Sequence, residues 1–133
     1  MNKPISSMMT RQTKTVTMDA SVTQVEQLMR QSAVSALPVV ENKTSGAGGN
    51  LVGIISAKDL MRFHQSKRDA NTVSAWEICT YKPIATSADT DISAVAKLMV
   101  DNAVHHIVIT ENTQIVGIVS ALDFVRKYIE NQS

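Results

Sequence analysis

The stretch Gly53-Ile54-Ile55-Ser56-Ala57-Lys58-Asp59 recurs 64 residues later as Gly117-Ile118-Val119-Ser120-Ala121-Leu122-Asp123. In each copy an apolar run leads directly into a Ser-x-x-Asp sequence. Serine is a favoured helix N-cap, and an acidic residue three positions later can complete a capping box. Aspartate is a less usual partner there than Glu or Gln, because its shorter side chain reaches the N-cap amide less easily. The stretch therefore predicts, twice, a buried strand that runs into the N-terminus of a helix.

The repetition extends outward from this stretch over most of the chain. A shift of 70 residues superimposes Thr10 on Thr80, Asp19 on Asp89, Val25 on Val95, Leu28 on Leu98 and Met29 on Met99. The six-residue change of register falls in a Gly-rich stretch, 41–50, which is only 111–114 in the second copy. Surface hairpin loops tolerate such length differences best. The chain is thus expected to hold two units of roughly 60 residues, which are too small for generous separate cores and should pack on each other.

Each unit is expected to follow the order strand, helix, strand, strand, helix. In the first copy these are 15–17, a helix that starts at 19–21, 37–40, 51–55 and 58–67; in the second they are 84–86, a helix that starts at 89–91, 107–109, 115–119 and 122–131. The first helix of each copy carries one apolar stripe, made of Val22, Val25, Leu28 and Met29, or of Ile92, Val95, Leu98 and Met99. Lead-in segments 5–10 and 75–80 precede the copies, with Trp76 as an expected packing anchor. The predicted fold class is α/β, with repeats at 1–70 and 71–133.

Composition excludes several classes of protein. With 133 residues, a net charge of +1, 44% hydrophobic and 4% aromatic residues, the chain is neither a disordered segment nor a typical binder of polymeric nucleic acid. The single cysteine, Cys79, excludes an internal disulfide and disfavours a cysteine-built zinc site. The first residues lack the apolar core of a signal peptide, and the apolar runs are too short to span a membrane, so a cytoplasmic location is expected. No catalytic motif stands out, so no enzyme activity is expected.

The Ser-x-x-Asp sequence supports two interpretations that do not exclude each other. In the first, both side chains simply cap the helix. In the second, the helix N-terminus and the Ser hydroxyl hold a phosphate, while the Asp accepts hydrogen bonds from the two hydroxyls of a ribose.

The chain resembles a tandem pair of CBS domains (cystathionine-β-synthase-type repeats), an arrangement called a Bateman module. The resemblance rests on the segment 34–40 (Val-Ser-Ala-Leu-Pro-Val-Val), on the two Gly-Ile-(Ile/Val)-Ser-x-x-Asp copies and on the lead-in Met8-Met9-Thr10-Arg11, and it spans residues 5 to 128. It implies two β-α-β-β-α units packed with pseudo-twofold symmetry. It also implies a stand-alone regulatory sensor that binds AMP, ADP, ATP or S-adenosylmethionine, forms a homodimer and signals to an effector protein in trans. It implies no other cofactor.

By this resemblance, the ligands occupy two clefts between the repeats. The first cleft would be formed by Ile54, Ser56, Asp59, Ile84, Ala85 and Val104, and the second by Ile118, Ser120, Asp123, Thr15, Val16, Val34 and Ala36. The alternative is an interaction or dimerisation module whose clefts are vestigial and hold no ligand.

Three cationic or titratable residues extend this set. His105 and His106 precede a strand at a point where the family often carries groups that approach ligand phosphates, although solvated or packed histidines fit the pattern equally well. Adjacent strand residues point to opposite faces, so a shared metal ion is not expected. Lys58, inside the first Ser-x-x-Asp, would favour a polyphosphate, or it is an ordinary surface charge of the helix.

Overall fold

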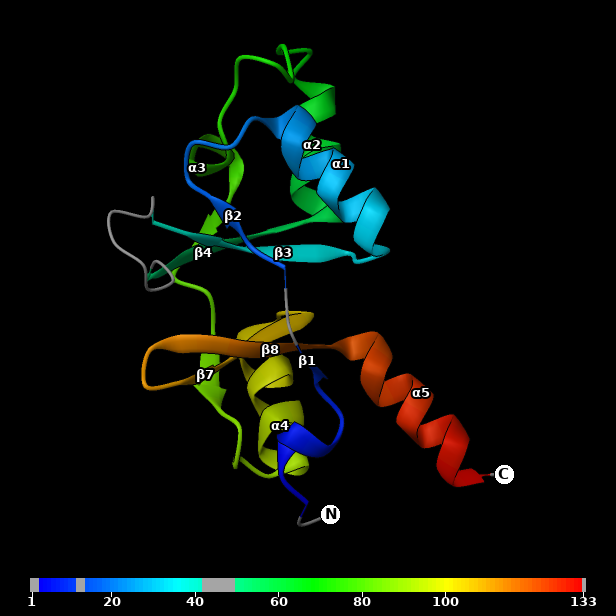
Figure 1. Cartoon of the computed structure of the whole chain (residues 1–133). Coiled ribbons are helices and arrows are strands. Elements are labelled where there is room, and N and C mark those ends of the chain that lie inside the picture. The colour runs from blue at the N-terminus through cyan, green and yellow to red at the C-terminus, as the bar shows by residue number, and fades with distance from the viewer. Residues whose placement is uncertain (1–2, 12–13, 42–49, 133) are drawn as a thin grey trace. The chain divides into compact units, whose positions relative to one another are not determined.

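A computed structural model describes residues 3–11, 14–41 and 50–132 (Figure 1). The chain forms two compact units, one made of Lys14–Pro83 and the other of Met1–Thr13 together with Ile84–Ser133. Each unit combines one four-stranded sheet with helices, so the predicted α/β class is confirmed. The Gly-rich loop expected at 41–50 lies mostly outside the described residues.

The unit Lys14–Pro83 contains β2 (Val16–Thr17), α1 (Val22–Ser32), β3 (Ala36–Val40), β4 (Leu51–Ser56), α2 (Ala57–Gln65), α3 (Ala75–Ile78) and β5 (Thr80–Tyr81). Its sheet has the order β2-β3-β4-β5. β2 runs parallel to β3, and the remaining pairs are antiparallel. The expected strand-helix-strand-strand-helix order is therefore present, followed by the short α3 and an edge strand.

The other unit has the same plan. It contains a 3₁₀ turn η1 (Ile5–Ser7), β1 (Thr10–Arg11), β6 (Ala85–Ser87), α4 (Ile92–Asn102), β7 (His106–Glu111), β8 (Gln114–Ser120) and α5 (Ala121–Gln132). Its sheet has the order β1-β8-β7-β6, with β6 parallel to β7 and the other pairs antiparallel.

The lead-in segments behave alike in both units. Each is a short helical turn followed by a two-residue strand at the sheet edge: η1 with β1 on β8, and α3 with β5 on β4. The first lead-in therefore belongs to the compact unit of the second repeat, whereas the division at 70/71 follows the repeats along the chain. That division, like the pseudo-twofold packing, stays a prediction.

Trp76 is not the packing anchor of its lead-in segment. Its side chain is 48% exposed, whereas its neighbour Ala75 is fully buried and contributes to the core. The amide of Ala75 donates to the Ala20 carbonyl at 2.7 Å, and that of Trp76 donates to the Met18 carbonyl at 3.1 Å. The backbone and a small side chain dock the segment, so the large ring is left outside.

The hydrophobic stripes predicted for α1 and α4 form the cores. Their buried members are Val22, Val25 and Met29 in α1, and Ile92, Val95 and Met99 in α4. All five residues of β3 are buried, but burial alternates along β4, where Gly53 and Ile55 are buried and their neighbours are half-buried. A continuous apolar run therefore does not imply full burial of both faces here.

Helix ends explain why the elements stop where they do. Ser21 caps α1 in a box with Gln24: Gln24 N donates to Ser21 Oγ at 3.1 Å, and Ser21 N donates to Gln24 Oε1 at 2.9 Å. α1 and α4 both end on an alanine in the left-handed region, Ala33 and Ala103, each with φ of 53°. Such a residue turns the chain sharply out of the helix toward the next strand.

Candidate functional site

The first Ser-x-x-Asp sequence joins β4 to α2. Asp59 Oδ2 accepts from the backbone N of Ser56 at 2.9 Å and from Ser56 Oγ at 3.3 Å. Asp59 Oδ1 accepts from Thr80 Oγ1 at 3.2 Å and lies 3.6 Å from Arg62 Nη1. The Asp59 side chain is only 4% exposed, so this carboxylate is the buried polar centre of the corner.

The second copy joins β8 to α5 with a reciprocal capping box. Ser120 N donates to Asp123 Oδ2 at 2.8 Å, and Asp123 N donates to Ser120 Oγ at 3.3 Å. Arg126 Nη1 lies 3.5 Å from Asp123 Oδ1. The Asp123 side chain is 19% exposed, so the second carboxylate is more accessible than the first.

The capping interpretation is therefore confirmed in both copies. The argument that Asp is too short to reach the N-cap amide was wrong: Asp59 and Asp123 both reach it within 2.9 Å. The extended backbone of Ser56 (φ −116°, ψ 171°) leaves its amide close to the first turn of α2, within reach of the shorter side chain. Capping leaves the ligand interpretation open, because a carboxylate can accept further hydrogen bonds.

The glycine of each copy has a structural role that the sequence analysis missed. A Cβ atom on Gly53 would lie 2.6 Å from the Thr80 carbonyl oxygen, and one on Gly117 would lie 2.8 Å from the Thr10 carbonyl oxygen. Both glycines thus admit the close approach of a lead-in strand, β5 or β1. The matched pair Thr10 and Thr80, 70 residues apart, was the available signal that lead-in and motif belong together.

Cys79 packs beside the first of these glycines. Its Sγ would lie 2.9 Å from a Cβ on Gly53, and its side chain packs against the core of this unit. Burial raises the pKa of the Cys79 thiol, which keeps it protonated. This agrees with the packing role expected from the sequence.

The two adjacent histidines differ in environment. His106 lies directly across from Ser120 in the β7–β8 ladder, whereas His105 precedes the strand and is exposed. Burial is the main cause that lowers the pKa of His106; the neighbouring His105 lowers it further, and Asp123 opposes the shift. The structure therefore brings His106, Ser120 and Asp123 together. Among the described residues no group of His, Cys, Asp and Glu could hold a metal ion.

The remaining expected ligand residues are distributed over both units. Ala36 faces Ser56 across the β3–β4 ladder, and Val16 lies on β2 beside β3. Ala85 lies on β6, paired with Val108 of β7. Of the others, Thr15, Val34, Ile54 and Lys58 belong to the unit Lys14–Pro83, and Ile84, Val104 and Ile118 belong to the other. Their grouping into two clefts stays a prediction.

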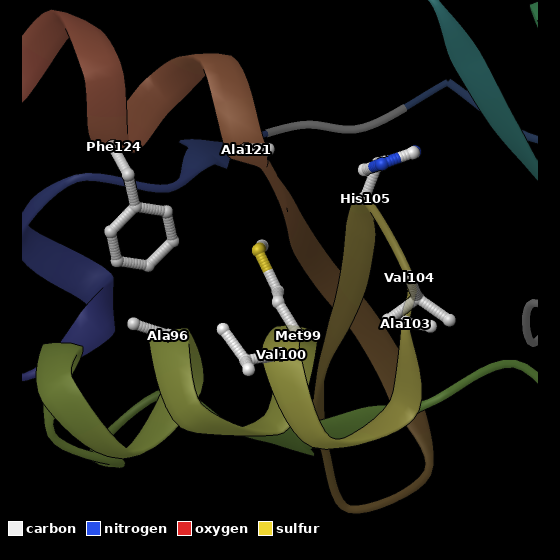
Figure 2. Close-up of a pocket in the computed structure, with 8 residues that line it drawn as sticks. All are labelled: Ala96, Met99, Val100, Ala103, Val104, His105, Ala121 and Phe124. Carbon is white, nitrogen blue, oxygen red and sulfur yellow. The ribbon is translucent and has the colours of Figure 1, made fainter.

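An apolar pocket of about 440 Å³ lies within the unit that contains α4 and α5. Phe124 extends from α5 toward α4, where Met99 and Val100 line the other side (Figure 2). Two expected ligand residues, Val104 and His105, lie at its far end, and the lining is completed by Ala96, Ala103 and Ala121.

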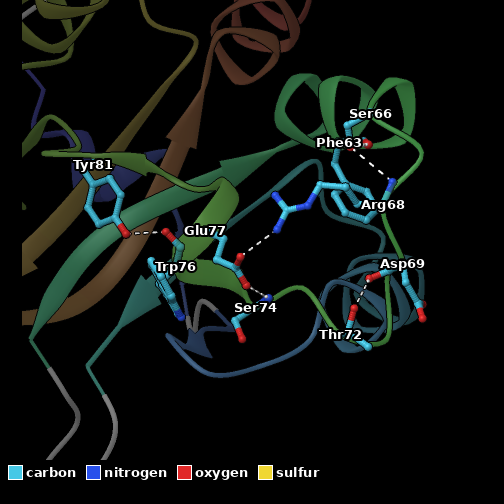
Figure 3. A network of polar contacts seen from close by, with 9 residues as sticks. All are labelled: Phe63, Ser66, Arg68, Asp69, Thr72, Ser74, Trp76, Glu77 and Tyr81. Atoms are coloured by element: carbon cyan, nitrogen blue, oxygen red, sulfur yellow. Dashed lines mark hydrogen bonds and ion pairs between the residues drawn. The ribbon is translucent and has the colours of Figure 1, made fainter.

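A polar network ties α3 to the end of α2. Glu77 accepts from Ser74 N at 2.8 Å and from Arg68 Nη2 at 2.9 Å (Figure 3). These two interactions lower the pKa of the Glu77 carboxyl, the Ser74 amide having the larger effect. On the other side, the Tyr81 hydroxyl donates to the Trp76 carbonyl. The segment 75–81 is thus held at both of its ends.

These two repeated units, each with a capped strand-to-helix corner, define a tandem α/β module. The family model of the CBS domain matches residues 5–66 and 75–130. The chain belongs to the CBS domain family and carries two copies of the domain. CBS domains are regulatory, non-catalytic modules, so these segments do not form an enzyme.

Relatives and solved structures agree with this assignment. The chain is 28% identical over 131 residues to an uncharacterised protein of Methanocaldococcus jannaschii, covering 98% of this chain but only 46% of that protein. A crystal structure of an uncharacterised conserved protein from Pyrococcus horikoshii matches with a TM-score of 0.82 and 26% identity, covering 96% of this chain and 93% of the other. A CBS domain pair in complex with 5′-methylthioadenosine and S-adenosyl-L-methionine matches with a TM-score of 0.80 and 21% identity, covering 94% and 98%. At that identity the last match shows the fold alone.

Proposed function

We propose that this CBS pair is a metabolite sensor that binds adenosine-containing ligands such as AMP, ADP, ATP or S-adenosylmethionine. The observation that carries the proposal is the repeated corner at which a Ser hydroxyl, an Asp carboxylate and a helix N-terminus meet. A ribose offers two adjacent hydroxyl donors to a carboxylate, and a helix N-terminus favours a phosphate. The similar fold of a CBS pair solved with adenosine derivatives supports this ligand class.

The second corner is the better prepared of the two for an anionic ligand. Asp123 is more exposed than Asp59, and His106 lies across the ladder from Ser120. A phosphate beside His106 would favour its protonated form and offset the cost of burying that charge. At the first corner Lys58 is exposed at the start of α2, where it could meet a polyphosphate.

We further propose that the protein forms a homodimer through α5. Leu122, Val125, Tyr128 and Ile129 of α5 are each more than half exposed, and their spacing places them along one stripe of the helix. Val100 of α4, which lines the apolar pocket, is 79% exposed. A stripe of large apolar side chains can pair with the same stripe of a second copy in an isologous contact. The partner that receives the signal and the cytoplasmic location stay predictions. Among the described residues no helix is long and apolar enough to cross a membrane.

The same exposed stripe favours the alternative function, a dimerisation module whose corners only cap helices. A thermal-shift panel with AMP, ADP, ATP and S-adenosylmethionine at millimolar concentration separates the two. A ligand sensor must melt higher with at least one of these compounds, since a ligand that binds only the folded state stabilises it. If none of them raises the melting temperature or binds in calorimetry, the sensor proposal fails and the dimerisation module remains.

A further inference from the structure

The hydrogen-bonding capacity of Asp59 is already used within its own unit. A carboxylate offers roughly four acceptor positions. Ser56 N and Ser56 Oγ approach Oδ2, while Thr80 Oγ1 and the Arg62 guanidinium approach Oδ1. With the side chain only 4% exposed, a ribose cannot bind this carboxylate unless some of these groups leave.

The groups on Oδ1 can leave more easily than those on Oδ2. The two contacts from Ser56 hold the N-cap, and breaking them would open the first turn of α2. Arg62 is 67% exposed and lies 3.6 Å away, so it can swing into solvent. The remaining group is the Thr80 hydroxyl at 3.2 Å, which comes from β5 and not from the corner itself.

Thr80 belongs to a segment that is held by few contacts. β5 has two residues and pairs only with β4, through Gly53 and Ile54. Thr80 and Tyr81 are both exposed. The fit of the Thr80 carbonyl and Cys79 against Gly53 is close, so a small displacement of β5 breaks it. The Thr80–Asp59 hydrogen bond is therefore the side-chain link between this edge strand and the corner.

We propose that Thr80 is a positioning residue that competes with the ligand's ribose hydroxyls for Asp59 Oδ1. Ligand binding at the first corner then releases β5, and the segment 75–81 loosens when the site fills. The proposal rests on the proposed function and adds its regulation: ligand occupancy is converted into a change of order in the segment between the two repeats.

The test uses Thr80→Val, which keeps the shape of the side chain and removes its hydroxyl, with Thr80→Ser as the matched control. The probe is AMP, measured by calorimetry, together with hydrogen exchange of the amides of residues 75–81. Without the competing hydroxyl, Thr80→Val should bind AMP about threefold to tenfold more tightly, the lower part of the range for a hydrogen bond to a charged group, because the bond is long. Its 75–81 amides should exchange faster without any ligand. Thr80→Ser should resemble the wild type in both respects.

In the wild type, saturating AMP should accelerate exchange at 75–81, whereas ligands ordinarily slow exchange. The 2′,3′-dideoxy analogue of AMP lacks the competing hydroxyls and should leave this segment unchanged. If the wild type binds AMP, but Thr80→Val binds it equally or more weakly and exchange at 75–81 does not rise, the competition is refuted while the proposed function stands. If the wild type binds neither AMP nor the other adenosine ligands, the proposed function fails and the competition fails with it.

Discussion

Replacing Gly53 by alanine should destabilise the protein by pushing β5 off the sheet. The added Cβ would lie 2.6 Å from the Thr80 carbonyl oxygen and 2.9 Å from Cys79 Sγ, whereas ordinary van der Waals contact begins at 3.4 Å. The backbone oxygen cannot rotate away, so β5 has to move as a whole. Gly53 is not among the residues with positive φ, so an alanine has no backbone strain there.

The expected magnitude follows from two opposing effects. Overpacking of a close contact costs about 1–3 kcal/mol. A Gly→Ala change returns about 0.4–1 kcal/mol by restricting the unfolded chain. The net loss should be about 1–2 kcal/mol, which corresponds to a melting temperature lower by roughly 4–7 °C for a domain of this size.

Thermal and urea unfolding of Gly53→Ala measure this loss, with Gly117→Ala as the matched comparison. At Gly117 the nearest atom is Met9 Sδ at 2.7 Å, with the Thr10 carbonyl oxygen at 2.8 Å. The Met9 side chain is flexible and can move aside, so the second variant should lose less stability than the first. A Gly53→Ala protein that melts at or above the wild-type temperature would refute the account of why this position is glycine.

Four further outcomes are expected. Ala33→Gly should raise stability by about 0.5 kcal/mol in urea titration, because glycine adopts the left-handed conformation at φ 53° without penalty; a loss would contradict this. Asp59→Ala should cost about 2–3 kcal/mol and Asp123→Ala about 1 kcal/mol, since the first carboxylate is 4% exposed and the second 19%; equal losses would argue against the difference in burial. Burial lowers the pKa of His106, so the unfolded chain binds its proton better and stability should fall as pH drops below about 6.5; His106→Gln should flatten this fall in melting curves, and an unchanged profile would exclude the residue. Tyr128→Glu, which charges the exposed stripe of α5, should shift sedimentation toward a monomer without lowering the melting temperature by more than a few degrees; an unaltered dimer would move the interface elsewhere.

The element order was predictable from the sequence because the chain is written twice. The stripes of α1 and α4 follow the helical period, and the apolar runs that became β4 and β8 end at a recognisable N-cap. Each expectation made in one copy could be checked against the other. The fold class and the absence of catalytic machinery followed from the same pattern.

The failures concern contacts between segments distant in the chain. Trp76 was expected to be buried because of its size, but the backbone of its segment makes the docking contacts and the ring stays outside. The Thr80–Asp59 hydrogen bond spans 21 residues, and no local rule links a lead-in threonine to a capping aspartate. Capping alone explained the conspicuous Ser-x-x-Asp sequences, so the second use of the carboxylates had to come from the resemblance and stays a proposal.

The most direct test of the central claim is calorimetric titration of the wild type, Asp59→Ala and Asp123→Ala with AMP, ADP, ATP and S-adenosylmethionine. The account predicts that at least one of these compounds binds, and that each variant loses one binding site and keeps the other. Binding with the same stoichiometry in all three proteins would contradict the assignment of these carboxylates. The absence of binding by every compound to the wild type would contradict the sensor function itself.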